Sequence, residues 1–173
     1  MTAPGKAIGV LALVALTAAA RAQPAPSDPL APLRFLVGEW KAIDNAPGES
    51  GAFAFTLSVQ NHVMTRTNYA VYEANAARPS SRHDDFMMIY ADADVLKADY
   101  VDSEGHAIQY IVSSSRANEV VFLCAPTAKG PGYRLSYVLM PEGLLKGQFE
   151  VAAPGDRGAF KQYLVWTARR VAK

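Results

Sequence analysis

The segment from Asp99 to Tyr110 contains the residue types best suited to acid–base chemistry. A hairpin turn at Ser103–Gly105 would place Asp102 opposite His106 on adjacent strands. Such a pair could supply a base and the group that orients it, as in a small-molecule isomerase, cyclase or hydrolase. In the structural alternative, the Asp102 carboxylate accepts backbone N–H bonds of the turn and His106 pairs with it. The composition of the turn favours this alternative, so no catalytic residue is assigned.

Arg66 and Asn68 lie two residues apart and therefore share one face of a predicted strand. If that face is inward, Arg66 is a buried cation that needs a partner, and it could receive the carboxylate or other anionic head group of a ligand. If the face is outward, Arg66 is simply solvated, and alternation alone does not decide between the two. The candidate residues for lining a ligand cavity are Arg66, Asn68, Tyr90, Tyr100, His106, Tyr110 and Tyr163.

The remaining ligand-forming side chains do not predict a metal site. The three histidines, His62, His83 and His106, lack the spacing of zinc ligands, and His83 is expected in a solvated loop. Cys124 is the only cysteine, so the chain forms no internal disulfide, and its apolar neighbours indicate a small buried side chain.

The elements that must position these residues are almost all strands. Hydrophobic residues alternate with small or polar ones, and Gly, Pro, Asn and Asp clusters recur at short intervals between the runs. This pattern is typical of an antiparallel barrel or sandwich. About ten strands are predicted, near residues 39–44, 51–60, 63–73, 86–92, 95–102, 106–114, 119–125, 132–140, 144–151 and 159–170. A short helical turn is expected around Leu30–Leu36, and the link from Glu73 to Asp85 is expected to be one long loop.

Composition restricts the class of protein. The chain has 173 residues, of which 50% are hydrophobic and 19% charged, with a formal net charge of +1. These values fit one compact domain and exclude a disordered chain. The basic residues are scattered, so no nucleic-acid partner is predicted. We expect a monomer.

The N-terminus resembles an export signal. Lys6 precedes an apolar run, Ala7–Ala20, which is too short to cross a bilayer and ends at Ala20-Arg21-Ala22, a small-x-small cleavage site. We therefore predict a signal peptide at 1–22, a proline-rich tether at 23–32 and a β-barrel domain at 33–173. The mature chain is expected in the periplasm or secreted, without a transmembrane segment.

Both ends of the predicted domain carry a recognisable pattern, with Gly38-x-Trp40 on the first strand and Arg169-Arg170 closing the last. This pattern resembles the calycins, which include lipocalins and fatty-acid-binding proteins. The two end strands are more similar to nitrobindin-like haem-binding barrels and to bacterial lipocalin-like domains of unassigned function. The resemblance implies an up-and-down barrel of about ten strands, one end of which is locked by an arginine packed on the tryptophan.

The resemblance also implies binding of a small apolar or amphipathic molecule, in a continuous cavity bordered by residues such as Arg66, Tyr100, His106 and Tyr163. In nitrobindin-like barrels a histidine of the last strand ligates haem iron, but Tyr163 occupies that place here. A tyrosine ligates haem only as a stabilised phenolate, so haem is kept as a minor alternative and no cofactor is predicted. An interaction module of the cell envelope is the remaining alternative.

Overall fold

The computed structural model describes residues 28–156 and 158–172. The predicted signal peptide, 1–22, and the first part of the predicted tether lie outside these residues. No helix among the described residues has the length and apolar character needed to cross a membrane.

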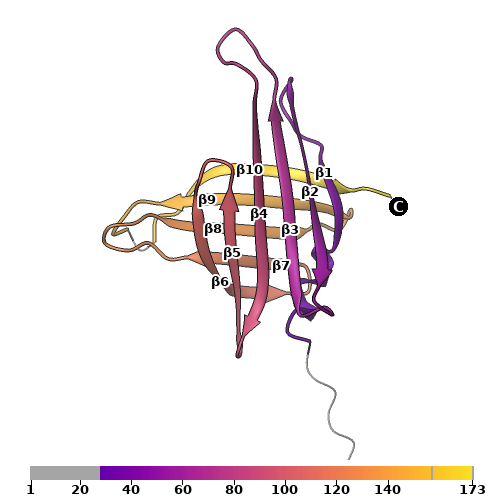
Figure 1. Ribbon diagram of the computed structural model, residues 1–173, viewed down its shortest axis with the longest axis vertical. Helices are drawn as coiled ribbons and strands as arrows, with labels where there is room; N and C mark the ends of the chain where they lie inside the picture. Colours follow the sequence, from indigo (N-terminus) through magenta and orange to yellow (C-terminus); the bar gives the residue numbers. More distant parts are fainter. Residues whose placement is uncertain (1–27, 157, 173) are drawn as a thin grey trace, which may run out of the picture.

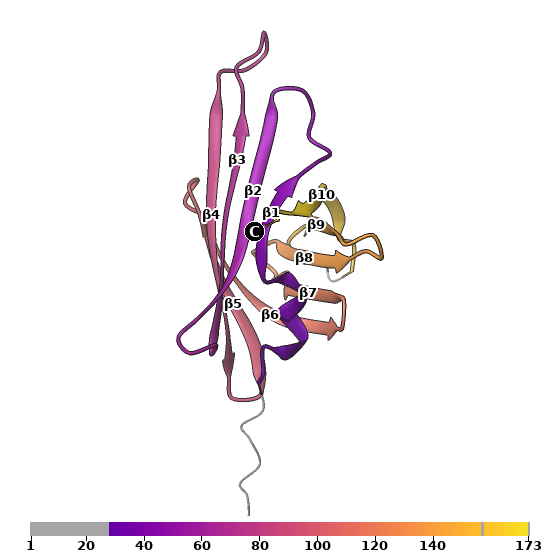
Figure 2. The ribbon, with the colours of Figure 1, turned by 90° about the vertical axis from the view of Figure 1, so that its right-hand side faces the viewer.

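The described chain is an all-β, antiparallel, up-and-down barrel of ten strands with a short N-terminal 3-10 turn, as predicted. Each strand pairs with its neighbours in sequence, and pairing of β1 with β10 closes the barrel. The long strands β2–β4 form one layer and cross the direction of β7–β10 in the other (Figures 1 and 2). The elements are η1 (Ala31–Leu36), β1 (Gly38–Ala42), β2 (Glu49–Ser58), β3 (Val63–Tyr72), β4 (Ser81–Asp92), β5 (Val95–Asp102), β6 (Ala107–Arg116), β7 (Glu119–Cys124), β8 (Gly132–Leu139), β9 (Leu144–Ala152) and β10 (Lys161–Arg170).

The period-two pattern of the sequence separates the inner face of the barrel from the outer one. On β4, Met87 and Ile89 are buried, whereas Phe86 and Met88, which alternate with them, are exposed. The buried side chains of the other strands join them in one continuous apolar core between the two layers. Burial of this apolar surface is the main stabilising contribution to such a fold.

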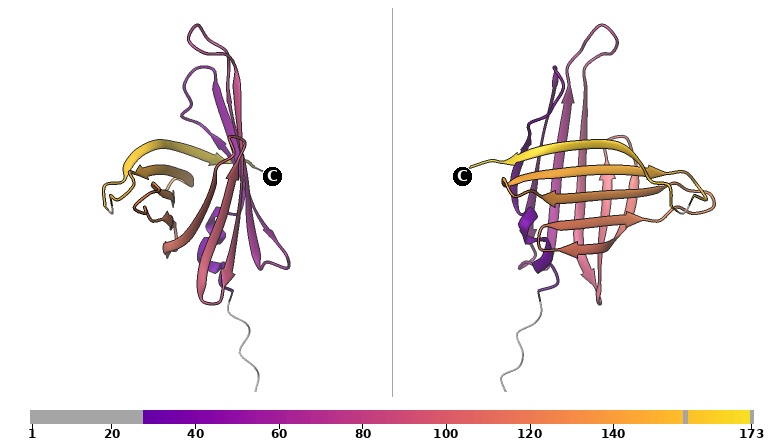
Figure 3. Two further views of the ribbon diagram at one scale, coloured as in Figure 1. Left: turned by 60° about the vertical axis from the view of Figure 1, so that its left-hand side comes forward. Right: turned by 180° about the vertical axis from the view of Figure 1, so that it is seen from behind.

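The predicted long loop between Glu73 and Asp85 is wrong in part, because β4 already begins at Ser81. The β3–β4 hairpin extends well beyond β10, as Figure 3 shows from two sides. On this hairpin, Arg82 lies over the Tyr69 ring and Arg78 over the Tyr72 ring. The strand start at Ser81–Asp85 is polar because most of it extends past the core, so the hydrophobic alternation that marks a strand is missing there.

One end of the barrel is closed by η1 and by the residues of the predicted lock. The Trp40 ring is fully buried, and its Nε1 donates to the Leu36 carbonyl at 2.8 Å. Arg170 donates through Nη2 to the Phe35 carbonyl at 2.9 Å and through Nη1 to the Val37 carbonyl. Arg169 points the other way and is exposed. The arginine that faces Trp40 is therefore Arg170.

Candidate functional site

Arg66 lies inside the barrel at the centre of a polar cluster. The residue is 5% exposed, so the face of β3 that it shares with Asn68 is the inner one. Arg66 donates through Nη2 to Asp85 Oδ1 and through Nη1 to the Tyr137 hydroxyl. The Asn68 side chain donates to the other Asp85 oxygen, Oδ2, at 2.8 Å. Arg66 Nε is buried and has no hydrogen-bond partner among the described residues.

Asp85 supplies the partner that a buried Arg66 was expected to need. Burial by itself lowers the Arg66 pKa, but the electrostatic effects of Tyr137 and Asp85 outweigh it and raise that pKa above its ordinary value. Burial raises the pKa of Tyr137 to about 12, against the opposing effect of Arg66. The cluster therefore holds the Arg66–Asp85 ion pair beside a Tyr137 phenol that is neutral at neutral pH.

Two further predicted tyrosines lie beside this cluster. Tyr110 is 3% exposed, and burial raises its pKa while the nearby Arg66 charge opposes the rise. Burial also raises the pKa of Tyr100, which is again within electrostatic range of Arg66. The structure thus brings together four of the predicted residues: Arg66, Asn68, Tyr100 and Tyr110. It adds Asp85 and Tyr137, which sequence reasoning did not select.

Aromatic side chains continue from the cluster toward a partly exposed region of the inner face, here called the mouth. It contains Tyr133, Phe149, Leu164 and Trp166. Tyr137 meets the Trp166 ring edge-on, and Tyr133 stacks on Phe149 with centroids 5.9 Å apart. Except for Tyr137, these rings are only partly buried although they pack on the core. Leu164 lies opposite Phe149 on the Trp166 face of β10, yet it is 49% exposed. Solvent therefore reaches inward-facing apolar side chains at the mouth.

Tyr90 faces away from the interior, and Tyr163 lies at the edge of the barrel. Tyr90 is on the outer face of β4, because it alternates with the buried Ile89, and its hydroxyl donates to Asp99 Oδ2 at 3.0 Å. Tyr163 lies where the β9–β10 register shifts and is 70% exposed. Its ring meets the inward-facing Phe149 edge-on, so it lies at the edge of the mouth.

The Asp102 carboxylate stabilises the β5–β6 turn through hydrogen bonds, and His106 contacts it. Asp102 Oδ1 accepts the backbone N–H groups of Glu104 at 3.0 Å and His106 at 2.9 Å. Oδ2 lies 2.8 Å from His106 Nδ1 and accepts the Tyr100 hydroxyl at 3.2 Å. Burial acts to raise the Asp102 pKa, but these hydrogen bonds, led by the His106 backbone N–H, hold it below the ordinary value. The His106 side chain is 66% exposed and lines no enclosed space.

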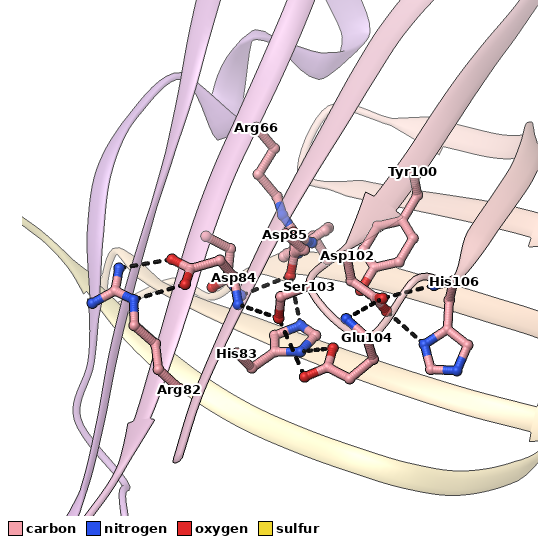
Figure 4. A network of polar contacts seen from close by, with 12 residues as sticks. Arg66, Arg82, His83, Asp84, Asp85, Tyr100, Asp102, Ser103, Glu104 and His106 are labelled. Atoms are coloured by element: carbon pink, nitrogen blue, oxygen red, sulfur yellow. Dashed lines mark hydrogen bonds and ion pairs between the residues drawn. The ribbon is translucent and has the colours of Figure 1, made fainter. Parts of the chain in front are cut away.

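His83 corrects the expectation of a solvated loop histidine. It lies on β4, and its side chain is 28% exposed between two carboxylates. Its Nδ1 is 2.6 Å from Glu104 Oε2, and its Nε2 is 3.2 Å from Asp85 Oδ2 (Figure 4). One ligand atom each from His83, Asp102 and Glu104 lie within 4.8 Å of one another. Sequence spacing could not reveal this cluster, because the pairing of β4 with β5 assembles it.

Two hollows of the described residues open on the surface. One, of about 430 Å³, lies over β6–β9, where Arg134 holds Glu150 and covers the Phe160 ring. The other, of about 380 Å³, lies over β1–β4 beside Tyr69 and Arg82. The second is lined by the candidate residue Asn68, and neither is lined by Arg66, Tyr100, His106 or Tyr163. The continuous cavity expected at those residues therefore stays a prediction, and the partly exposed inner side chains lie at the mouth.

Comparison with models of protein families finds none that matches the chain, and comparison with curated proteins finds no match. The closed ten-strand antiparallel barrel is consistent with a calycin-like fold.

Proposed function

We propose that the chain is an exported lipocalin-like barrel that binds a small, largely apolar molecule carrying one neutral hydrogen-bond acceptor. The observation that carries the proposal is Arg66 Nε, a buried donor without a partner among the described residues. A buried polar group left unsatisfied costs about 1–3 kcal/mol. A ligand atom that accepts this hydrogen bond would recover that free energy inside the barrel.

The charge of the cluster selects the kind of acceptor. Arg66 and Asp85 form a buried ion pair, with side chains 6% and 3% exposed. A ligand carboxylate would add a second negative charge at a site with one guanidinium, and burial of an uncompensated charge is costly. A carbonyl, ether or hydroxyl oxygen accepts the Nε hydrogen bond without adding charge. The proposed ligand is therefore neutral at this end.

The body of the ligand would lie in the mouth. Phe149, Trp166 and Leu164 supply inward-facing apolar surface that solvent reaches. Partly exposed aromatic surface beside a few convergent polar groups is typical of small-molecule sites. Because the inner side chains near Arg66 are well buried, the acceptor would reach Nε only when Tyr100 or a neighbouring side chain moves aside.

The alternatives have less support. An isomerase, cyclase or hydrolase built on Asp102 and His106 would need His106 in an enclosed site, and its side chain is 66% exposed. A haem ligated by Tyr163 would need a base or cation to stabilise the phenolate, but the ring meets the apolar Phe149. Export to the periplasm or the medium, and a monomeric state, belong to the proposal on the strength of the N-terminal sequence and the barrel.

Two adjacent residues of β10 provide the test. Leu164 and Val165 are 49% and 46% exposed but point to opposite faces of the strand, inward and outward. We would titrate the wild type, Leu164→Lys and Val165→Lys with Nile red, a neutral apolar dye that carries a carbonyl group, and follow its fluorescence. A lysine at 164 places a charge at the mouth and should weaken binding at least tenfold, whereas lysine at 165 should leave binding unchanged.

Absence of dye binding to the wild type, or equal binding by both variants, would overturn the proposal. Native mass spectrometry of protein purified from its own source would then identify the physiological ligand class. A co-purifying neutral lipid-sized mass supports the proposal, and a Soret absorbance band in the same sample would replace it with the haem alternative.

A further inference from the structure

We propose that His83, Asp102 and Glu104 bind a divalent first-row transition-metal ion at the junction of β4 and the β5–β6 turn. The proposal rests on the arrangement of these three side chains and is independent of the ligand proposed for the barrel. Figure 4 shows them together with the charged residues around them.

Strand register brings the three residues together. Asp85 of β4 pairs with Asp102, the last residue of β5. The turn that follows stays attached to β4, because the Ser103 N–H donates to the Asp84 carbonyl at 2.9 Å and the Ser103 hydroxyl accepts the Asp84 N–H at 3.1 Å. Glu104 is thereby held beside His83, and the donor set is fixed by the backbone rather than by long flexible side chains alone.

The donor atoms lie near the separation that an ion requires. One ligand atom from each of the three residues lies within 4.8 Å of the other two. Bonds of about 2.0–2.2 Å from a zinc ion to nitrogen and oxygen place neighbouring ligands roughly 3–4 Å apart. His83 Nδ1 and Glu104 Oε2 are now 2.6 Å apart, so a small outward shift of these two partly exposed side chains admits the ion.

The electrostatics of the cluster favour a cation. The neighbouring arginines are already paired, Arg66 with Asp85 and Arg82 with Asp84. Among the described residues, Asp102 and Glu104 have only histidines as ion-pair partners. With neutral histidines the site holds two uncompensated carboxylates, one of them only 5% exposed, and a divalent ion balances both charges. The ion would take the place of the direct contact between His83 and Glu104.

The donor types indicate the class of ion. One imidazole nitrogen and two carboxylate oxygens suit zinc, manganese or iron(II), whereas magnesium and calcium prefer oxygen ligands throughout. Three protein ligands leave at least one coordination position for water. The site is therefore expected to bind zinc exchangeably and to discriminate against magnesium.

The test is isothermal titration calorimetry of chelator-treated protein with ZnCl₂ and, separately, MgCl₂. The wild type should bind one zinc ion per chain and give no signal with magnesium. His83→Ala and Glu104→Gln should each weaken zinc binding at least tenfold. His62→Ala is the matched control, because His62 is an exposed histidine in the β2–β3 turn outside the cluster, and it should bind zinc like the wild type.

Three results would overturn the metal site: no zinc binding by the wild type, wild-type affinity in both cluster variants, or a loss caused equally by His62→Ala. Glu104→Gln alters a side chain that is 45% exposed, so this variant keeps the test decisive if His83→Ala proves unstable. Zinc should also raise the melting temperature of the wild type but not of Glu104→Gln, because an ion that binds only the folded state stabilises it.

Discussion

The Arg170 guanidinium carbon lies 4.1 Å from the centre of the Trp40 ring. These two residues stand opposite each other in the β1–β10 pairing that closes the barrel. Arg170 also donates to the carbonyls of Phe35 and Val37, at the end of η1. One side chain thus joins the first strand, the last strand and the 3-10 turn.

Replacing Arg170 should therefore destabilise the fold. Arg170→Met removes a cation–π contact worth about 1 kcal/mol and two hydrogen bonds of roughly 1 kcal/mol each. Because Arg170 is exposed and solvent weakens these contacts, we expect a loss of about 2 kcal/mol in the free energy of unfolding, measured with urea. Arg169→Met, next to it on the outer face, should change stability by less than about 0.5 kcal/mol. Equal effects of the two substitutions would contradict a specific role for Arg170.

Gly38 is required both for its backbone conformation and for the space beside Arg170. Its φ is +129°, and an added Cβ would collide with Arg170 Nη1. Gly38→Ala should destabilise the protein more than Gly143→Ala, because Gly143 also has a positive φ, +74°, but has open space around it. Thermal unfolding of both variants measures the difference. A larger loss at Gly143 would contradict a special requirement for glycine beside Arg170.

The strands could be predicted wherever one face packs on the core. Met87 and Ile89 alternate with exposed neighbours, and such runs were recognisable as strands in the sequence. The start of β4 at Ser81 could not be found in this way, because most of that segment extends above the core and carries polar residues on both faces. Its pairing with β3 depends on backbone hydrogen bonds and arginine–tyrosine contacts, which leave no periodic signal.

The candidate site was only partly predictable for a related reason. Alternation placed Arg66 and Asn68 on one face but did not say which face was inward. Tyr137, which accepts a hydrogen bond from Arg66, is 71 residues away in the sequence and comes from the opposite layer. The sequence position of Asp85 suggested a loop, so its pairing with Arg66 became visible only with the strand register.

The Asp102 turn should make stability depend on pH. Hydrogen bonds hold the Asp102 pKa below 3.8, its unfolded value, so the folded state gains stability from the carboxylate above that pH. This gain is lost as the pH falls through the lower folded-state pKa. We expect Asp102→Asn to be less stable than the wild type at pH 7, with the difference shrinking below pH 3.8. Urea unfolding across pH 2–7 measures this difference in stability. A difference that grows on acidification would contradict a lowered Asp102 pKa in the folded state.

The ion pair of Arg66 and Asp85 should show strong coupling in a double-mutant cycle. Arg66→Met leaves the buried Asp85 carboxylate without its cation, and we expect a loss of about 3–5 kcal/mol in the free energy of unfolding. Asp85→Asn in the same chain removes the stranded charge while the amide still accepts from Asn68. The double variant should therefore be more stable than Arg66→Met alone, by about 1–3 kcal/mol. If the losses of the single variants simply add, Arg66 is not neutralised by Asp85. A ligand carboxylate would then be the better partner for the Arg66 guanidinium, and this result would overturn the proposal of a neutral ligand.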